Sequence, residues 1–316
     1  MARIVVALGG NALQADPKDI SAEAQLRTTR HTARAIVDLI EDGHEVIIAH
    51  GNGPQVGQIV ATYEAAASQD PSKPLMPFPE CGAMSQGYIG YHLQQALREE
   101  MIRRGLKKSV AAIVTQVVVD EDDPGFENPT KPVGSFFTEE QAKKLINEKG
   151  YVMKEDAGRG WRRVVASPMP KAVVEEEIVR TLVSAGHVVI TVGGGGVPVI
   201  EKEDGGLKGV AAVIDKDLAS ERIAELLDAD ELVILTTVEK VALNFNKPEQ
   251  RNLSSMTVDE AKKYMEEGHF APGSMLPKVK AAVMFVESKK GRKAIITSLE
   301  KARDALSGKT GTVITG

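Results

Sequence analysis

Hydrophobic residues follow two alternating patterns along the chain: short, nearly unbroken runs, and longer stretches in which they recur every three or four positions. Residues 4–8 (Ile-Val-Val-Ala-Leu), 45–50 and 188–192 are runs of the first kind. Such runs are typical of strands that are buried on both faces of a parallel sheet. The helical spacing between them predicts amphipathic helices. The alternation therefore predicts an α/β fold, a three-layer αβα sandwich around a mainly parallel sheet.

Flanking residues indicate where several of these helices begin and end. Ser21 is a potential N-cap for a helix that ends before Gly43, and Pro54 can occupy the first position of a second helix. Further helices are predicted around residues 89–101, 139–148, 174–182, 219–227 and 258–267, and one more begins at Pro277. Further strands are predicted at residues 110–119, 210–217, 232–236, 294–297 and 312–315.

Three of the predicted strands run directly into glycine-containing turns. These turns are residues 9–11 (Gly-Gly-Asn), 51–53 (Gly-Asn-Gly) and 193–196 (four glycines). The carboxyl ends of parallel strands meet at one edge of a sheet, where ligands bind. Glycine lets backbone N–H groups approach phosphate or carboxylate closely, and residues 51–53 also precede a predicted helix whose first N–H groups lack partners. We therefore expect the three turns to outline an anion site.

The interval from 121 to 170 differs from the rest of the chain. It contains prolines at 124, 129, 132, 168 and 170 and the only tryptophan, Trp161. A structureless loop of this length inside a compact domain would be unusual. We therefore predict a small protruding lid with the helix at 139–148 and two short strands. It would be inserted in an N-terminal lobe of about residues 1–212, and a C-terminal lobe would follow at about 213–316.

Composition narrows the class of protein. The formal net charge is −5, so no general attraction to nucleic acid or to an anionic membrane is expected. Cys81 is the only cysteine, which excludes an intrachain disulfide and fits a reducing compartment. No apolar stretch approaches the ~18 residues that a membrane helix needs, and the start is too short for a signal-peptide core. We expect a cytoplasmic protein.

Three lysines lie beside segments that could bind phosphate. Lys278 is in the first turn of a predicted helix, where a cation is unfavourable by up to ~1 kcal/mol unless an anion binds there. Lys216 lies at the end of a predicted strand between two aspartates, and Lys131 lies in a loop bounded by prolines. Each lysine alone is more simply explained as a solvated surface residue. Together they favour phosphoryl transfer, which depends mainly on positioning and charge.

Other chemical signatures are absent or left open. Residues 308–310 (Gly-Lys-Thr) mimic the end of a P-loop, but Arg303 stands where the motif needs glycine. The six histidines show no paired ligand spacing, so no metal site made by the protein itself is predicted. Asp217 could orient lysines or the magnesium of a nucleotide, and it could equally be a helix cap.

Six stretches together indicate a family. They are residues 7–13 (Ala-Leu-Gly-Gly-Asn-Ala-Leu), 50–57 (His-Gly-Asn-Gly-Pro-Gln-Val-Gly), 128–134, 192–198, 212–217 and 273–278. With these segments the chain resembles the carbamate kinases of the amino acid kinase fold family over nearly its whole length. The resemblance implies phosphoryl transfer between ATP and carbamate, giving ADP and carbamoyl phosphate, often run toward ATP during arginine breakdown. It also implies Mg²⁺ bound with the nucleotide, and a homodimer.

The resemblance implies a role for each matching residue. Carbamate and the transferring group would be bound by Gly9, Gly10, Asn11, Gly51, Asn52 and Gly53. The catalytic residues around the phosphates would be Lys131, Lys216, Lys278 and Asp217. The nucleotide would contact the C-terminal lobe at Asp215, Thr237, Val238, Ala242, Phe245, Met275 and Lys278. Phe245 stands where relatives often carry tyrosine, so stacking on adenine is retained and a hydroxyl hydrogen bond is not.

Two alternative functions stay open. The chain could be a related kinase that phosphorylates a larger carboxylate or a phosphate monoester, although the small turn at Gly9 and Gly10 and the absence of an arginine clamp nearby favour a small acceptor. It could also be a non-catalytic sensor of a nucleotide or metabolite. A sensor would bind ATP without turnover, and the three lysines argue against it.

Overall fold

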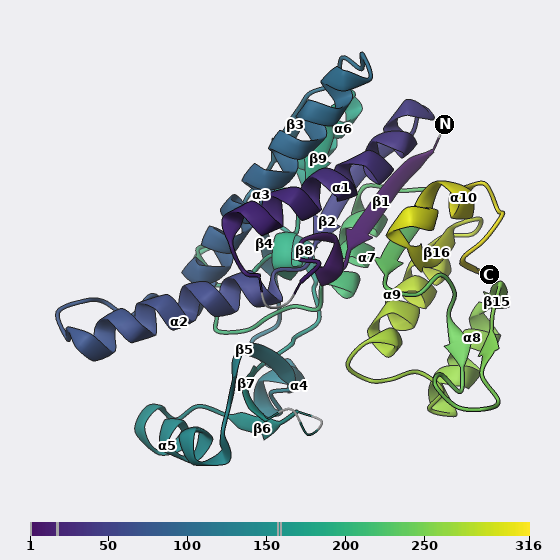
Figure 1. Cartoon of the computed structure of the whole chain (residues 1–316). Helices are drawn as coiled ribbons and strands as arrows, with labels where there is room; N and C mark the ends of the chain where they lie inside the picture. The colour runs from purple at the N-terminus through teal and green to yellow at the C-terminus, as the bar shows by residue number, and fades with distance from the viewer. Residues whose placement is uncertain (1, 17–18, 157, 159) are drawn as a thin grey trace.

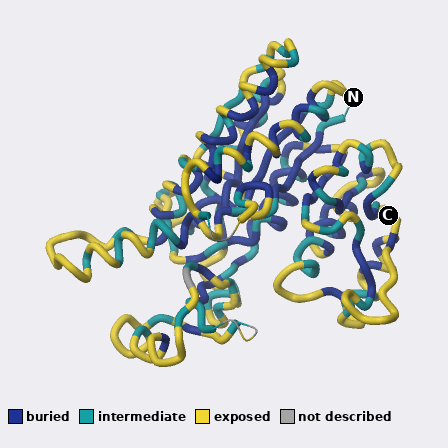
Figure 2. Tube along the Cα trace, in the orientation of Figure 1, coloured by how far each residue is buried: buried dark blue, intermediate teal, exposed yellow. Residues whose placement is uncertain are grey.

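The structure, a computed structural model, describes residues 2–16, 19–156, 158 and 160–316 (Figure 1). Strands and helices alternate along these residues, and the long helices lie on both faces of one central sheet. Buried residues are concentrated in this sheet and in the helix faces that cover it (Figure 2). The predicted αβα sandwich is confirmed.

The central sheet has eight strands in the order β15-β17-β16-β12-β1-β2-β9-β3. All neighbouring strands run parallel except β16 and β17, which are antiparallel. The sheet passes without a break between the two predicted lobes, whose boundary near residue 212 stays a prediction. In sheet order the strands are Ser255–Thr257, Thr312–Thr315, Lys293–Ser298, Glu231–Thr236, Arg3–Leu8, Glu45–His50, Val188–Ile190 and Val110–Ala112.

Two hydrophobic cores separate this sheet from its helices. Side chains alternate across β1, so residues 4, 6 and 8 enter the core under α1, α3 and α10, and residues 5 and 7 enter the core under α6, α7, α8 and α9. The helices of the first layer are Ala22–Glu41, Phe78–Arg103 and Ala302–Leu306, and those of the second are Glu176–Ser184, Lys216–Leu226, Val258–Glu266 and Met275–Ser288. In the described residues no helix is long and apolar enough to cross a bilayer.

Three small sheets and α2 complete the fold. Helix α2 (Gly53–Gln69) projects from the body, and the lid lies beside it (Figure 1). The lid consists of α5 (Glu139–Lys149) and the antiparallel strands β5 (Lys131–Phe137), β7 (Trp161–Val165) and β6 (Met153–Glu155). The remaining elements are α4 (Pro124–Glu127), the sheet of β11 (Leu207–Gly209), β10 (Val197–Glu201), β4 (Gln116–Val118) and β8 (Ala172–Val173), the pair β13 (Ala242–Leu243) and β14 (Arg251–Asn252), and the short helices η1 (Gly10–Ala12), η2 (Gly193–Gly195) and η3 (Leu299–Lys301).

The predicted strand at residues 110–119 is wrong in one respect, because it consists of two strands in different sheets. β3 lies at the edge of the central sheet, and β4 belongs to a four-stranded sheet. Between them, the side chain of Gln86 on α3 accepts a hydrogen bond from the Thr115 N–H at 2.8 Å and donates one to its carbonyl at 3.0 Å. A side chain thus satisfies the backbone where the chain leaves the central sheet.

The predicted strand at residues 210–217 is also wrong. The segment makes one isolated bridge, between Ala166 and Ala212, and α7 already begins at Lys216. The helix begins there because the Asp215 side chain accepts a hydrogen bond from the Asp217 N–H at 2.9 Å, which is an N-cap. Lys216 is therefore the first residue of a helix and does not end a strand.

Smaller differences concern the lid and α9. Lys131 is the first residue of β5, although it was expected in a loop, and the lid has three strands where two were predicted. Helix α9 begins at Met275, so Pro277 is its third residue and does not open it. Lys278 still lies in the first turn, as predicted.

Candidate active site

Two of the predicted turns meet at the carboxyl edge of the central sheet. β1 is followed by Gly9 and η1, and β2, which pairs with it, is followed by Gly51. A Cβ on Gly9 would lie 3.1 Å from the backbone oxygen of Leu235, and a Cβ on Gly51 would lie 3.3 Å from the Lys216 Cδ. Because residue 51 has no side chain, the alkyl chain of Lys216 can lie against this turn.

Lys216 and Lys278 share one carboxylate. Lys216 Nζ donates to Oδ1 of Asp217, and Lys278 Nζ donates to Oδ2 of the same residue at 3.0 Å. Both lysines lie in the first turn of a helix, where the macrodipole disfavours a cation. Asp217 is 2% exposed and offsets part of this penalty.

Lys131 reaches the same place from the lid. Its Nζ lies 2.6 Å from Oδ2 of Asp215, whose Oδ1 caps α7. The cap of α7 thus joins the first strand of the lid to the turn that carries Lys216. The three lysine tips, which come from separate parts of the chain, bind two carboxylates that are two positions apart.

The electrostatics of this cluster favour an additional anion. Burial lowers the pKa of Lys216, and Asp217 opposes that shift. Burial alone would raise the pKa of Asp217, but the ammonium groups of Lys216 and Lys278 outweigh burial and lower it. Asp217 is therefore ionised at neutral pH. With Lys131 and Asp215, three cations face two carboxylates, which leaves one net positive charge at the edge of the sheet.

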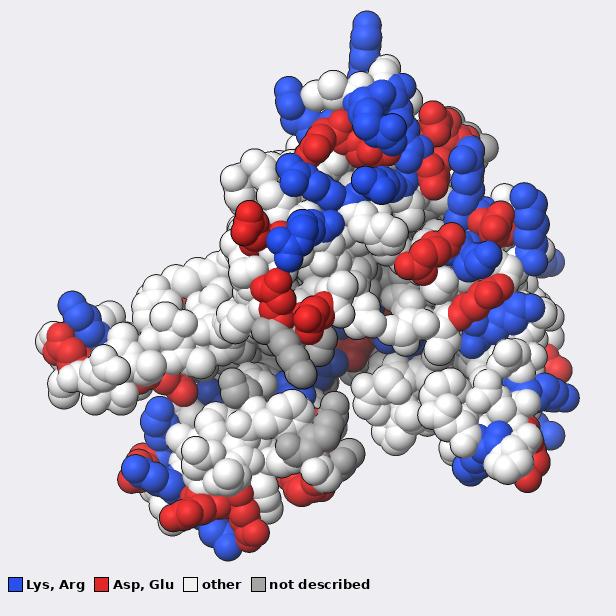
Figure 3. All heavy atoms as spheres, viewed as in Figure 1, with Lys and Arg blue, Asp and Glu red and all other residues white. Residues whose placement is uncertain are grey.

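A hollow of about 580 Å³ opens beside this cluster. Basic and acidic side chains are intermixed over the face shown in Figure 3. Among the predicted residues, the hollow is lined by Gly9, Gly10, Asn11, Lys216, Thr237 and Lys278. The hollow is also lined by Thr28, His31, Leu299 and Glu300, which were not predicted from the sequence.

A second hollow of about 410 Å³ is lined by other predicted nucleotide residues, Val238, Ala242 and Phe245. Phe245 is 53% exposed, so its ring is available for stacking. Thr237 lines the first hollow and Val238 lines the second, so consecutive residues contribute to both. Met275 packs against the hydrophobic core and lines neither.

The third predicted turn, at residues 193–196, lies behind the site and lines neither hollow. It is fully buried, and no side chain would fit there. A Cβ added at Gly193 would lie 2.5 Å from His50 Nε2, and one at Gly194 would lie 2.1 Å from Asn52 Nδ2. A Cβ at Gly195 would lie 2.2 Å from the backbone oxygen of Ile214, and one at Gly196 would lie 2.2 Å from Val117 Cγ2. The absence of side chains therefore lets this turn pack tightly against residues 50–52, Val117 and Ile214 beneath the site.

Asn52 is held from the side of α3. Its side-chain amide donates to Ser85 Oγ at 2.8 Å, in a buried position. Sequence reasoning gave Asn52 a role in binding substrate and missed Ser85, which nothing in its local pattern distinguishes. Gly53 is the first residue of α2 and is exposed, whereas Gly51 is half-buried.

His50, which ends β2, was also not selected. It is 1% exposed, and its Nδ1 lies 2.9 Å from the Gly51 carbonyl oxygen. Burial, helped by the charge of Lys216, lowers the pKa of His50 to about 4. The ring is therefore neutral at pH 7. The sequence signal that could have identified His50 is that it is a polar residue at the end of an apolar strand.

Asp215 and Asp217 are the acidic residues of this cluster. In the described part of the chain, no group of three or more His, Cys, Asp and Glu side chains is arranged to hold a metal ion. Both oxygens of Asp217 already accept hydrogen bonds from lysines. A divalent cation would therefore have to take most of its ligands from a bound phosphate or from water.

The profile of the amino acid kinase family matches residues 2–298. The chain belongs to this family. Carbamate kinase of Clostridium perfringens is 61% identical over 312 residues, which cover 99% of both chains. The carbamate kinase-like protein YqeA of Escherichia coli is 58% identical over 99% of this chain and 98% of its own. The structure of carbamate kinase from Giardia lamblia bound to AMP-PNP matches with a TM-score of 0.91 and 42% identity, over 99% of this chain and 98% of that one.

Proposed function

We propose that this chain is an ATP-dependent phosphotransferase that acts on carbamate, giving ADP and carbamoyl phosphate. The proposal rests on the shared carboxylate of Asp217, which holds Lys216 and Lys278 beside Gly9 and Gly10 at the rim of a large hollow. The similarity to carbamate kinases over the whole chain supports this choice of acceptor.

In the forward reaction, a carbamate oxygen attacks the γ-phosphorus of ATP while the bond from that phosphorus to the β,γ-bridging oxygen breaks. ADP carries away the electron pair, and no proton transfer is needed because carbamate is already ionised. Lys216 and Lys278 neutralise charge on the transferring group and on ADP, and Lys131 closes the site from the lid. The turns at Gly9–Asn11 and Gly51–Gly53 present backbone N–H groups to the anions. In the cell the reaction would run toward ATP during arginine breakdown.

The nucleotide would extend from the first hollow into the second. Its phosphates would lie near Lys278 and Thr237, and its adenine would stack on Phe245, with Val238 and Ala242 as apolar neighbours. Mg²⁺ bound to the phosphates would supply further charge neutralisation. Asp215 and Asp217 would hold the surrounding lysines and would not bind Mg²⁺ directly, because their oxygens already accept hydrogen bonds from lysines or from the α7 backbone.

We further propose a cytoplasmic homodimer. The central sheet ends at β3, a three-residue strand with one partner among the strands described, and Val114 just beyond it is 49% exposed. A second copy would cover this edge. Sedimentation equilibrium of the purified chain would distinguish a monomer from a dimer.

A coupled assay of ADP release tests the activity. Ammonium bicarbonate supplies carbamate spontaneously, and acetylglutamate, aspartate and a phosphate monoester are offered separately. We expect release with carbamate and none above background with the others. ADP release with another acceptor and not with carbamate would identify a related kinase. The test includes this outcome because one relative is called carbamate kinase-like. ATP binding without turnover on any acceptor would indicate a sensor.

A further inference from the structure

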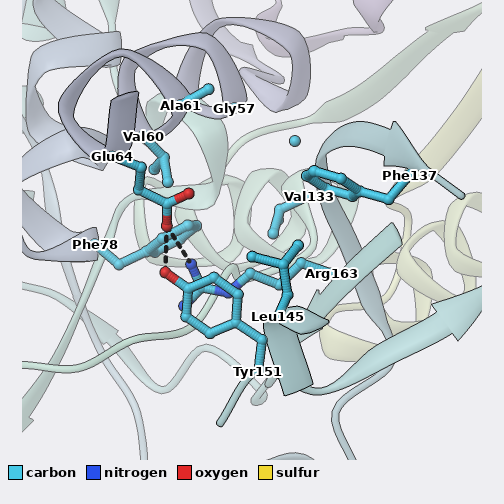
Figure 4. A pocket seen from close by; sticks show the side chains of 11 residues that line it. Gly57, Val60, Ala61, Glu64, Phe78, Val133, Phe137, Leu145, Tyr151 and Arg163 are labelled. Carbon is cyan, nitrogen blue, oxygen red and sulfur yellow. Dashed lines mark hydrogen bonds and ion pairs between the residues drawn. The ribbon is translucent and has the colours of Figure 1, made fainter. Parts of the chain in front are cut away.

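Glu64, on the outer half of α2, is the point at which the lid contacts that helix by charge. Three lid side chains lie close to its carboxylate, and Figure 4 shows two of them, Tyr151 and Arg163. Tyr151 donates its hydroxyl proton to Oε1, Arg163 Nη1 lies 3.8 Å from the same oxygen, and Lys149 Nζ lies 3.6 Å from Oε2. Arg163 also stacks on the Tyr151 ring, with its Cζ 3.8 Å from the ring centroid.

This contact is partly shielded from water. The side chains of Glu64 and Arg163 are 22% and 21% exposed, which is well below the exposure of an ordinary surface ion pair. Burial and the hydrogen bond to Glu64 raise the pKa of Tyr151 to about 12, so its hydroxyl keeps the proton that it donates. Tyr151 therefore remains a hydrogen-bond donor to Glu64 at neutral pH.

The lid packs on α2 and α3 through a small buried apolar cluster that includes Val56, Phe78, Val133 and Val165, but this packing is incomplete. A cavity of about 40 Å³ remains there, lined by Val60, Phe78, Val133, Leu145 and other residues (Figure 4). Close packing fixes the position of an element only where such gaps are filled. The outer half of α2 and the helix of the lid are largely exposed (Figure 2). The ionic contact at Glu64, one turn beyond Val60 on α2, therefore adds to this packing in setting the position of the lid.

The position of the lid reaches the candidate active site through β5. This strand begins at Lys131, which binds Asp215, and it pairs with β7, which carries Arg163. β5 also passes so close to α2 that a Cβ on Gly57 would lie 2.6 Å from the Gly134 Cα. Lys131 is thus held at one end by Asp215, and its strand is held along α2 at Gly57 and, through β7, at Glu64.

We propose that Glu64 is a positioning residue for phosphoryl transfer, which docks the lid on α2 and so places Lys131 against the transferring group. This inference rests on the proposed function for its kinetic part. Glu64 lines neither hollow, so it would act without contacting a substrate bound there. It acts by limiting the positions that the Lys131 ammonium group can take during phosphoryl transfer.

The test compares Glu64→Gln with Glu139→Gln. Glu139 is a matched control because it is a lid carboxylate with one lysine partner, Lys143 at 2.8 Å, on the exposed face of α5. We expect Glu64→Gln to lower kcat about tenfold, because small misplacements of a catalytic group have effects of this size, and to change the KM for ATP less than twofold. Glu139→Gln should leave both constants unchanged.

A double-mutant cycle separates positioning from general stability. In a Lys131→Ala background, Glu64→Gln should lower kcat by less than twofold, because the group that it positions is gone. A second route to the same displacement is Gly57→Ala, whose methyl group would push the backbone at Gly134 away. Unchanged kcat in Glu64→Gln, or a further tenfold loss in the Lys131→Ala background, would overturn the proposal.

Amide hydrogen exchange gives a readout that does not need turnover. Residues 131–137 should exchange faster in Glu64→Gln than in Glu139→Gln, whereas β1 and β2 should be unchanged. If the wild-type chain has no activity on carbamate, the proposed function fails, and this comparison still decides whether Glu64 holds the strand of Lys131. Equal exchange of residues 131–137 in both variants would contradict the positioning role.

Discussion

Lys278 donates a hydrogen bond at 3.0 Å to Asp217, which is 61 positions earlier in the chain, and thereby joins the first turns of two helices. Lys216 occupies the other oxygen of the same carboxylate. A single buried aspartate thus keeps two cations at the rim of the hollow before any anion binds. Preorganised charge of this kind stabilises a transition state without reorganisation at the moment of reaction.

Removing either lysine should therefore abolish most turnover. We expect Lys216→Ala and Lys278→Ala each to lower kcat about 10²–10³-fold, the range found when one preorganised group is lost. Steady-state kinetics of ADP release measure this. Lys280→Ala is a matched control, because Lys280 lies on α9 with its side chain exposed. Near-normal turnover in Lys216→Ala or Lys278→Ala would remove that lysine from the mechanism.

Phe245 should contribute to nucleotide binding through its ring. Phe245→Ala should weaken ADP binding about tenfold, since stacking of a base on an aromatic ring is worth roughly 1–3 kcal/mol. Phe245→Tyr keeps the ring and should bind at least as tightly as the wild type. Isothermal titration with ADP measures both variants. Equal affinity of the alanine and wild-type proteins would place adenine elsewhere.

The turn beneath the site should tolerate no side chain. Gly194 has φ of +66°, and a Cβ there would overlap Asn52. Gly268 has φ of +73° with open space around it, so Gly268→Ala reports the backbone penalty alone, about 1–2 kcal/mol. Gly194→Ala should lower the free energy of unfolding by several kcal/mol, because the overlap adds to that penalty. Urea titration of both variants measures the difference, and equal losses would show that Asn52 moves aside freely.

Glu221 should make stability depend on pH. It is 2% exposed on α7, and burial, with the nearby charge of Glu225, raises its pKa to about 7. A carboxyl group whose folded pKa is above its unfolded value of 4.5 stabilises the protein fully below that value. This contribution, of order 3 kcal/mol, is lost as the pH rises from about 4.5 to about 7.

Chemical denaturation between pH 5 and pH 8 tests this. Glu221→Gln should remove most of the pH dependence in this window and raise the free energy of unfolding at pH 8 relative to the wild type. Glu225→Gln should narrow the window, because removing the neighbouring charge lowers the pKa of Glu221. An unaltered pH profile in Glu221→Gln would assign the dependence to other groups.

Much of the fold could be predicted because local patterns and burial agree. Runs such as residues 4–8 are strands, and Ser21 caps α1 as expected. The prediction failed where a side chain from another element replaced a sheet partner, as Gln86 does at Thr115. It failed again at residues 210–217, where the Asp215 cap begins a helix directly after the apolar run.

The sequence by itself determined the sandwich, the glycine turns after β1 and β2, and the three lysines as candidates, because these follow from spacing and residue type within short segments. Only the tertiary structure decided that Asp217 holds two of those lysines, that the turn at residues 193–196 is buried behind the site, and that Glu64 ties the lid to α2. These relationships join residues tens of positions apart, and a local pattern contains no information about which distant side chain satisfies a buried charge or fills the space that a glycine leaves.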